Sequence, residues 1–350
     1  MKAAISIEHP AWAHQFKNII KKINAEGETL VLSVDKDGDI ELLDSFNIRH
    51  KKLADSTGRN IIEKGLLFVK LCIDYTREIK EFDPDILIGR ASPMMAVAAL
   101  LTGKPHVIFE DTEVSRFSLG ICKRFSICII TPQTFLSDLG RKQLRMPVYK
   151  ELFYLNRQFQ PDLNVLKESG INLEQRYAVV RFVAWNASHD VGKTGLNEEA
   201  KIDFITQLQE QIQVYISSED ELPEELKKYQ LKVPFDKIHH VLYYAALVIS
   251  EGASMASEAA VLGTHAFYLN EIASGTTEEQ EKRFHILKVL HDPVTRYRQT
   301  LIETKNMLKN ENLWKEGKEI REQMLREMPD PNMIFWEKMM EVCSRNEVEK

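Results

Sequence analysis

The stretch VISEGASMASEAAVLG, residues 248–263, has the pattern of a β-strand that turns directly into a helix. An apolar run leads into Glu251 and Gly252, and small residues then precede Glu258 on a helical pattern. In an open parallel sheet, ligands bind beyond the carboxyl ends of the strands, and the amides at a helix N-terminus suit a phosphate. An ordinary strand-to-helix turn has the same local pattern, so the choice between the two depends on the rest of the chain.

Apolar, strand-like runs alternate with helical patterns along the chain. In the first half, the predicted strands are 3–7, 29–34, 86–88, 106–109 and 126–130, and the predicted helices are 12–24, 37–46, 60–81, 93–102 and 134–139. In the second half, the predicted strands are 177–182, 213–217, 246–250 and 266–269, and the predicted helices are 197–209, 238–244, 254–262 and 278–290, with a charged helical tract at 296–327. Short apolar runs separated by helices are typical of βαβ units and parallel sheets. We predict an α/β protein with Rossmann-like domains at 1–160 and 161–328 and a C-terminal helix at 329–350.

Composition narrows the class of protein. The chain has 350 residues and a net charge of -6, which argues against a broad basic surface for nucleic acid. No run reaches the roughly 18 apolar residues of a membrane span, and the first residues lack the pattern of a signal peptide. Four cysteines without a CxxC pair are typical of reduced thiols. The sequence therefore indicates a cytoplasmic protein without a nucleic-acid partner, and leaves peripheral membrane contact open.

The turn quoted above carries the predicted nucleotide site. Gly252 lets the backbone turn and lets a ligand approach closely. A helix that begins at Ala253 or Ser254 offers its first N–H groups and a partial positive charge to a pyrophosphate. Glu258 lies four residues after Ser254 and so shares its helix face, where a carboxylate can accept hydrogen bonds from ribose hydroxyls. The alternative is that Ser254 is a plain helix cap and Glu258 a surface residue.

The segment ASHDVGKT, residues 187–194, fits a relaxed phosphate-loop pattern after the strand predicted at 177–182. Asn197 is the better helix cap, however, which places Lys193 too early for a phosphate-loop lysine. We expect this loop instead to contact a diphosphate, together with Arg181. Arg181 lies inside an apolar strand, so it needs a ligand phosphate or a buried acid as its partner. The predicted contacts are Arg181, Asn186, Ser188 and His189.

Polar residues also follow two strands of the first half. The segment SIEHPAWAHQF, residues 6–16, places His9 at a turn and His14 in the first turn of a helix, and an imidazole can remove a proton from a sugar hydroxyl. The segment EDTEVSRF, residues 110–117, places Asp111 and Glu113 at the end of a strand. Arg90 can bind an anionic acceptor or balance Asp111. The alternatives are packed or capping histidines and a solvated acidic loop. The spacing is irregular, so no metal site is predicted.

Residues 242–270, LYYAALVISEGASMASEAAVLGTHAFYLN, resemble the nucleotide-sugar site of GT-B glycosyltransferases and UDP-N-acetylglucosamine 2-epimerases. Glu258–Ala259 and Leu262–Gly263 match that pattern, whereas His265 stands where proline is usual. The resemblance implies that Glu258 holds the ribose and that the turn meets the phosphates through Gly252, Ala253, Ser254 and Met255. Over most of its length the chain also resembles the domain of unknown function 354 family, which shares IEHPAWAHQFKNII, EDTEVSRF and RFVAWNASHDVG.

The resemblance implies a GT-B fold, in which two Rossmann-like domains face a cleft and the C-terminal helix crosses back to the first domain. It implies a UDP-sugar-dependent glycosyltransferase of surface polysaccharide or glycolipid assembly, with a carbohydrate or lipid-linked acceptor and no cofactor. The catalytic candidates are His14, Asp111 and Glu113, and the acceptor-side candidates are His9 and Arg90. The epimerases carry an aspartate-threonine turn where this chain has Gly89–Ser92, and a Pro-Glu-Glu segment that it lacks. An epimerase-like enzyme and a non-catalytic nucleotide-sugar-binding protein stay as alternatives.

Overall fold

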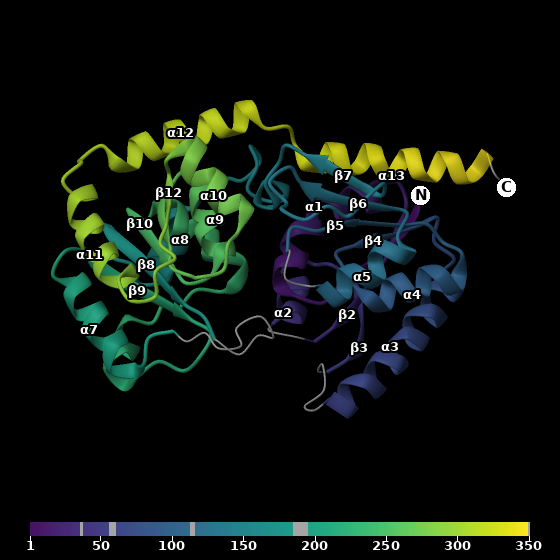
Figure 1. Cartoon of the computed structure of the whole chain (residues 1–350), viewed down its shortest axis with the longest axis horizontal. Helices are drawn as coiled ribbons and strands as arrows, with labels where there is room; N and C mark the ends of the chain where they lie inside the picture. Colours follow the sequence, from purple (N-terminus) through teal and green to yellow (C-terminus); the bar gives the residue numbers. More distant parts are fainter. Residues whose placement is uncertain (36–37, 56–60, 113–115, 185–194, 349–350) are drawn as a thin grey trace. The chain divides into compact units, whose positions relative to one another are not determined.

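The computed structural model describes the whole chain except residues 36–37, 56–60, 113–115, 185–194 and 349–350. The chain forms two compact units (Figure 1). Unit 1 contains Met1–Asn156 and Pro329–Lys350, and unit 2 contains Arg157–Met328. The chain therefore returns to unit 1 at its C-terminal end, as the resemblance to GT-B proteins implies. None of the described helices is long and apolar enough to span a membrane.

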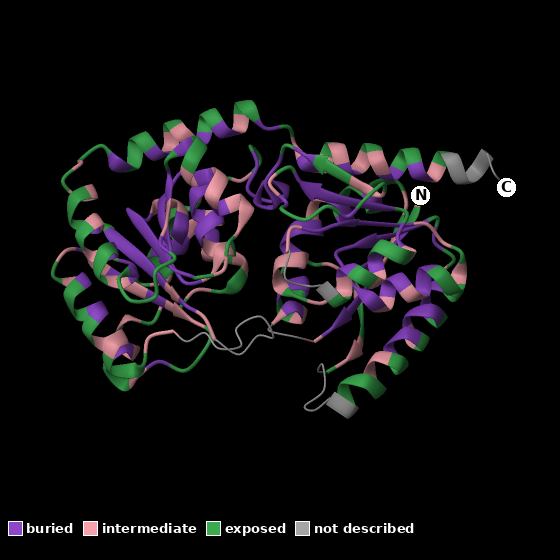
Figure 2. Ribbon diagram, in the orientation of Figure 1, coloured by how far each residue is buried: buried purple, intermediate pink, exposed green. Residues whose placement is uncertain are grey.

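Within the described residues, unit 1 contains a seven-stranded parallel sheet in the order β3-β2-β1-β4-β5-β6-β7. The strands are β1 (Lys2–Ile7), β2 (Glu28–Val34), β3 (His50–Ala54), β4 (Ile86–Gly89), β5 (His106–Phe109), β6 (Cys128–Pro132) and β7 (Gln143–Met146). The helices are α1 (Pro10–Glu26), α2 (Asp39–Ser45), α3 (Ile61–Phe82), α4 (Pro93–Thr102), α5 (Arg116–Phe125) and α13 (Pro331–Val348), with a 3-10 turn η1 (Lys150–Phe153). Figure 2 shows the strands buried and the outer sides of the helices exposed.

Helices α3 and α13 show how unit 1 builds its core. Leu71, Tyr75 and Ile79 lie four residues apart on α3, so they share one face, and they pack on the sheet with Leu87 of β4. On α13, Phe335 is fully buried and its ring lies 5.8 Å from that of Phe16 on α1. The C-terminal helix is therefore part of the core of unit 1, because it buries an aromatic side chain there.

Unit 2 has a second parallel sheet, whose five described strands run in the order β12-β11-β10-β8-β9. The strands are β8 (Tyr177–Phe182), β9 (Gln213–Ser218), β10 (Leu247–Ser250), β11 (His265–Tyr268) and β12 (Leu287–Val289). The helices are α6 (Leu163–Glu168), α7 (Glu198–Gln209), α8 (Ile238–Tyr244), α9 (Ala253–Val261), α10 (Gly275–Glu279), α11 (Arg296–Met307) and α12 (Leu313–Glu327), with 3-10 helices η2 (Glu224–Tyr229) and η3 (Phe235–Lys237) and the π-helical turn η4 (Gln280–Phe284). Asn197 caps α7 as predicted, because its Oδ1 accepts from the Ala200 amide at 2.8 Å.

Helix α12 is fastened to the carboxyl ends of α8 and α9. Lys318 Nζ donates to the carbonyl oxygens of Tyr243 at 2.7 Å and Leu262 at 2.9 Å. Helix C-termini carry partial negative charge that favours a cation. Burial opposes it and lowers the pKa of Lys318 well below its usual range, so the hydrogen bonds to these carbonyls hold the Nζ group in place. One residue earlier, Gly317 and Gly263 bring their backbones so close that a Cβ on Gly317 would lie 2.3 Å from Gly263 O. Two glycines and one lysine thus set the distance between α12 and α9.

The predicted fold class is confirmed, but two predicted helices differ from the structure. Residues 134–139 form turns and bends, so the helix predicted there is wrong. The helix predicted at 278–290 is wrong in its second half, where η4 is followed by the strand β12. Phe284, Leu287 and Leu290 are spaced as on a helix face, and such short apolar runs fit helix and strand alike.

The sequence pattern does not predict β3, β7, β12 or α5. The sequences of β3 and β7 are HKKLA and QLRM, in which charged or polar residues interrupt the apolar positions. These two strands, like β12, lie at the edges of their sheets. Edge strands are often short and charged, which prevents pairing with other chains and removes the apolar signal that a sequence search relies on.

The buried histidine of β5 predicts a loss of stability in acid. His106 is fully buried, and burial lowers its pKa to about 3 from 6.5. Because the folded pKa is the lower one, the unfolded chain binds this proton more readily, and stability falls as pH drops from about 6.5 toward 3. His106 alone should lower the free energy of unfolding by up to ~1.4 kcal/mol per pH unit in this range. Urea denaturation of the unaltered protein and of His106→Asn at several pH values measures the free energy of unfolding. If this free energy falls equally with pH in both proteins, the prediction is contradicted.

Candidate functional site

The turn after β10 in unit 2 is fixed by its own side chains. Ser250 Oγ donates to Gly252 O at 2.7 Å and accepts from Gly252 N at 3.1 Å. A Cβ on Gly252 would lie 3.2 Å from Val183 Cγ1. Its φ is -99°, so the glycine is needed for this close approach and not for a left-handed conformation. The backbone therefore turns tightly at the carboxyl end of a central strand.

Helix α9 begins at Ala253 without a side-chain cap. Gly252 occupies the N-cap position, so the alternative that Ser254 is a plain helix cap does not hold. The first N–H groups of a helix have no partner within the helix, and they carry its positive end. The amides of Ala253, Ser254 and Met255 therefore face outward as donors suited to an anion. The helix starts where the sequence predicts it, and the contact of residues 252–255 with phosphates stays a prediction.

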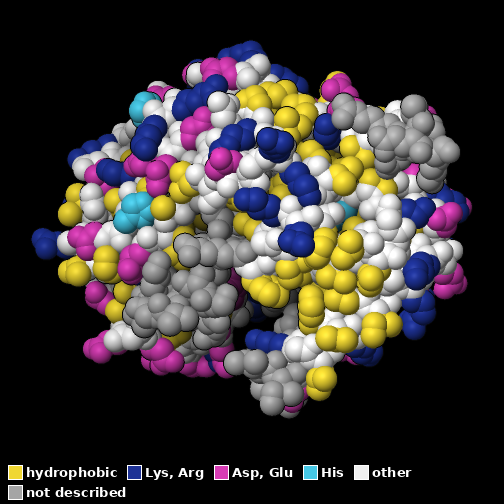
Figure 3. All heavy atoms as spheres, turned by 45° about the vertical axis from the view of Figure 1, so that its right-hand side comes forward, with side chains coloured by type: hydrophobic (Ala, Val, Ile, Leu, Met, Phe, Trp, Pro, Cys, Tyr) yellow, Lys and Arg dark blue, Asp and Glu magenta, His cyan; other side chains and the backbone are white. Residues whose placement is uncertain are grey.

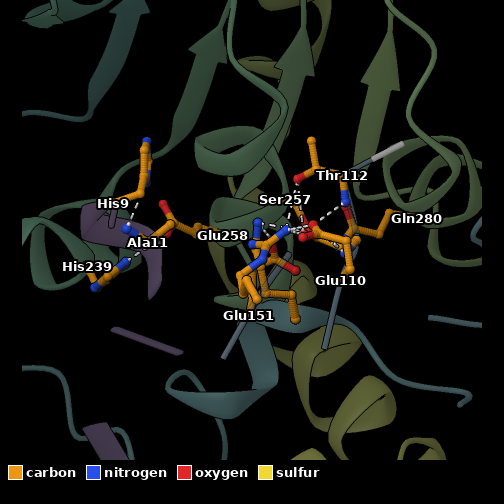
Figure 4. A network of polar contacts seen from close by, with 12 residues as sticks. His9, Ala11, Glu110, Thr112, Glu151, His239, Ser257, Glu258 and Gln280 are labelled. Carbon is orange, nitrogen blue, oxygen red and sulfur yellow. Dashed lines mark hydrogen bonds and ion pairs between the residues drawn. The ribbon is translucent and has the colours of Figure 1, made fainter. Parts of the chain in front are cut away.

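Glu258 lies one turn into α9 and pairs with a histidine. Its Oε1 is 3.2 Å from His239 Nε2, and the side chains are 13% and 4% exposed. Figure 4 shows the two side chains pointing toward each other. Glu258 is therefore not a solvated surface residue, which was the alternative for it. His239 comes from α8, and the pair HH at 239–240 before a buried strand is the signal that could have found it.

A second residue outside the sequence prediction, Gln280, adjoins α9. Its Nε2 donates to Ser257 Oγ at 2.9 Å, and both side chains are buried. Gln280 opens η4, the π-helical turn that follows α10. The sheet order places Gln280 next to α9. Strand β11 pairs with β10, the strand that leads into α9, and η4 follows β11 in the chain.

The strand residue Arg181 finds an acid as its partner. Arg181 Nη2 donates to Glu219 Oε1 at 2.6 Å, and Nη1 donates to Ser217 Oγ at 2.8 Å. Glu219 Oε2 also accepts from Ala184 N at 2.9 Å. Glu219 is 42% exposed, so it is not the buried acid expected for Arg181, and a ligand phosphate as a further partner of Arg181 stays a prediction. The other residues predicted for this loop lie outside the described residues: Asn186, Ser188 and His189.

Next to this pair, the buried Glu251 ties three elements of unit 2 together. Its Oε2 accepts from Val183 N at 3.0 Å, after β8, and its Oε1 accepts from the Tyr297 hydroxyl at 2.5 Å, on α11. Burial and the neighbouring Glu251 raise the pKa of Tyr297, so this hydroxyl stays protonated and donates. Glu251 therefore holds the backbone that follows β8 at Val183 against the turn before α9.

In unit 1, polar residues at the ends of β4 and β5 form a buried charge cluster. Arg90 Nη2 pairs with the carboxylates of Glu110 and Asp111 and donates to Thr112 Oγ1 at 2.8 Å. Glu110 Oε2 accepts from Ala91 N at 3.0 Å and its Oε1 from Thr112 N at 2.8 Å. Figure 4 shows Glu110 and Thr112 within this network. Of the two roles considered for Arg90, the structure shows the balance of Asp111.

Lys150 joins this cluster from η1. Its Nζ lies 2.9 Å from Asp111 Oδ2 and 3.6 Å from Glu151 Oε1. Burial opposes the charge of Asp111, but Arg90 and Lys150 outweigh it and hold the pKa of Asp111 well below its usual range. Burial likewise opposes the charge of Lys150, and Asp111 and Glu151 raise its pKa. The sequence analysis missed Lys150, whose only signal is a Lys-Glu pair inside an aromatic stretch.

The two histidines of α1 differ in their surroundings. His9 is exposed and caps the helix, since its Nδ1 accepts from Ala11 N at 3.1 Å. A neutral ring that accepts through Nδ1 carries its proton on Nε2, so this atom is a donor. His14 is 6% exposed, with its ring 5.2 Å from that of Phe46 and 5.3 Å from that of Tyr154. The structure thus shows one capping and one packed histidine, as the alternatives for these two residues had it, and their roles toward an acceptor stay predictions. Glu113 lies outside the described residues.

Two parallel-sheet units joined in this way define a GT-B-like fold, and solved structures share it. The UDP-GlcNAc 2-epimerase from Neisseria meningitidis bound to UDP-GlcNAc has a TM-score of 0.68 and 12% identity over 97% of this chain and 100% of its own. A putative UDP-N-acetylglucosamine 2-epimerase from Listeria monocytogenes has a TM-score of 0.65 and 13% identity, over 95% of this chain and 92% of its own. The spinosyn rhamnosyltransferase SpnG complexed with thymidine diphosphate has a TM-score of 0.61 and 13% identity, over 97% of this chain and 99% of its own. At such identities the likeness shows the fold.

The chain belongs to the family described as "Protein of unknown function (DUF354)", which matches residues 1–341. Among curated proteins, none matches it. Within the described ranges, no group of three or more His, Cys, Asp or Glu side chains is arranged to hold a metal ion. The donors that face outward at α9 are thus backbone amides, whose charge comes from the helix.

Proposed function

We propose that this protein is a glycosyltransferase that uses a nucleoside diphosphate sugar, most simply a UDP-sugar. The observation that carries the proposal is the start of α9, where uncapped amides at residues 253–255 are followed, one turn later, by Glu258. An anion fits the amides, and hydroxyl donors fit the carboxylate. A nucleoside diphosphate presents both groups, because its pyrophosphate adjoins a ribose.

In this proposal, Glu258 accepts hydrogen bonds from the ribose hydroxyls and His239 fixes the orientation of its side chain. The α9 amides hold the pyrophosphate and take up the charge that develops on the departing diphosphate. The tight turn at Gly252 lets the phosphates approach the backbone, since a side chain there would already press on Val183. This use of fixed dipoles provides charge stabilisation that needs no metal.

The acceptor side of the proposal lies in unit 1. His9 Nε2–H is a donor for an oxygen of the acceptor, because Nδ1 accepts from Ala11 N. Two cations hold Asp111 ionised, and a carboxylate with a depressed pKa is a weak base. Asp111 and Arg90 therefore suit the positioning of the loop after β5 better than proton removal. Among the described candidates, His14 stays the proposed proton acceptor.

The nucleotide site is tested by Glu258→Ala. Loss of charged hydrogen bonds to the ribose should weaken the binding of UDP, or of whichever nucleoside diphosphate a thermal-shift screen selects, by about 1–3 kcal/mol, roughly 5- to 150-fold. Isothermal titration calorimetry measures the dissociation constant. Glu199→Ala, at an exposed acid of α7, is the matched control and should leave affinity unchanged. Equal affinities of Glu258→Ala and the unaltered protein would refute the assignment.

Product analysis separates the reaction from its alternatives. With the nucleotide sugar alone, a transferase leaves the sugar unchanged apart from slow hydrolysis, and it releases nucleoside diphosphate rapidly when an acceptor is added. A new sugar epimer formed without an acceptor would instead establish the epimerase-like alternative. Tight binding with no product under either condition would favour the non-catalytic nucleotide-sugar-binding protein, while leaving the site at α9 intact.

A further inference from the structure

The outer face of α3, α4 and α5 in unit 1 exposes large apolar side chains. Six of them are between 56% and 71% exposed: Leu66, Val69, Ile73, Leu100, Leu101 and Phe117. Figure 3 turns this side of the molecule toward the reader and shows hydrophobic side chains gathered there beside lysine and arginine. Single exposed apolar residues are ordinary, whereas a cluster of this kind marks an interaction surface.

The six side chains belong to one continuous surface. Leu66, Val69 and Ile73 are spaced three and four residues apart, so they form a stripe along α3. Helix α4 packs against both α3 and α5, and the rings of Phe68 and Phe117 join α3 to α5 at 6.4 Å. The opposite face of α3 already fills the core. The exposed stripe therefore does not take part in the core packing of unit 1.

Cations line this apolar surface. Lys70, Lys123 and Arg124 are exposed and have no acidic partner among the described residues. Lys70 lies within the α3 stripe, four residues after Leu66, and Arg124 shares a face of α5 with Phe117, seven residues earlier. The net charge of the whole protein is -6, so this cationic border differs in sign from the overall charge.

Most acids of these helices are already engaged or lie at the helix ends. Asp74 pairs with Arg77 at 3.1 Å. Glu78 is 5% exposed and pairs with Lys51. The exposed acids Glu63 and Glu81 lie near the two ends of α3. The middle of the surface is thus apolar and its border is mainly cationic.

We propose that this surface docks on a membrane whose lipid headgroups carry negative charge. Apolar side chains bordered by lysine and arginine are the composition that rests in the headgroup region of a bilayer, where the stems of the cations stay apolar and their heads meet phosphate. A second copy of the chain is a poorer occupant, because it would bring two cationic borders together. The proposal does not depend on the sugar-transfer reaction, since the six side chains and their border lie on α3, α4 and α5.

The test is sedimentation of the full chain with vesicles. Vesicles of equal parts phosphatidylcholine and phosphatidylglycerol should pull down the protein, and those of phosphatidylcholine alone should retain much less, because each lysine or arginine near an anionic surface strengthens partition roughly fivefold. The variant Leu100→Glu/Phe117→Glu should lose at least tenfold in partition, and Lys123→Glu/Arg124→Glu should lose the preference for phosphatidylglycerol. Phe235→Glu/Val294→Glu, at 58% and 87% exposed positions of unit 2, is the matched control and should bind like the unaltered protein.

Three outcomes would overturn the proposal. The first is no sedimentation of the unaltered protein with phosphatidylglycerol vesicles at low salt. The second is equal loss of binding in the Phe235→Glu/Val294→Glu control, which would mean that overall charge, and not this surface, governs partition. The third is a dimer in solution, seen by light scattering, that Leu100→Glu/Phe117→Glu dissociates while vesicle binding is absent, since a second copy would then cover the surface. Circular dichroism melts of each variant establish that these exposed substitutions leave the fold intact.

Discussion

Replacing Arg90 with methionine should destabilise the protein by about 3–5 kcal/mol, because the substitution leaves two carboxylates without their guanidinium partner in a buried site. The side chains of Arg90 and Glu110 are each 3% exposed and that of Asp111 is 14% exposed, so water cannot replace the guanidinium. Lys150 neutralises only part of the remaining charge, since it faces Asp111 and Glu151. The loss of free energy of unfolding is measured by urea denaturation at neutral pH.

A surface arginine and a double variant serve as controls for Arg90→Met. Arg77→Met removes ion pairs to Asp74 and Glu78 at a side chain that is 63% exposed. Lys51 still pairs with Glu78, so the substitution should cost less than about 1 kcal/mol. Adding Asp111→Asn to Arg90→Met removes one of the stranded charges and should restore part of the stability. Equal effects of the two arginine substitutions, or no recovery in the double variant, would show that the cluster is not held by charge.

Gly317→Ala should cost about 3 kcal/mol, at the upper end of what overpacking costs in a tight interior. The added methyl group would lie 2.3 Å from Gly263 O, which is backbone and cannot rotate away. Gly263 has a φ of +73° after the end of α9, so neither its conformation nor its position yields easily. Helix α12 must therefore shift, which also strains the hydrogen bonds of Lys318 to the ends of α8 and α9.

Urea unfolding measures this effect too, and Gly65→Ala is the control. Gly65 lies in α3, where a Cβ would meet nothing within 4 Å. The same substitution should there stabilise the protein by about 0.5–1 kcal/mol, because alanine loses less conformational freedom in a helix than glycine. The two changes should thus have opposite signs. A neutral Gly317→Ala would mean that α12 is free to move away from α9.

Several features of the protein could be predicted from short segments alone. Alternating apolar runs and helical patterns predicted the two parallel sheets, because both periods are set by local geometry. The turn at Glu251–Gly252 and the cap at Asn197 were predicted for the same reason, since a helix start depends on neighbours within a few residues. The edge strands β3 and β7 escaped prediction because their charged residues, such as Lys51 and Lys52, carry no apolar period.

The tertiary structure alone decided which polar groups meet. Arg90 and Asp111 are 21 residues apart, and only the neighbouring positions of β4 and β5 bring them together. Glu258 faces His239 because α8 precedes the strand that leads into α9, and nothing within reach of a local pattern links them. Sequence periodicity reports which side of an element is buried. The partner of a buried charge depends on strand order, and that order is fixed by the packing of the whole unit.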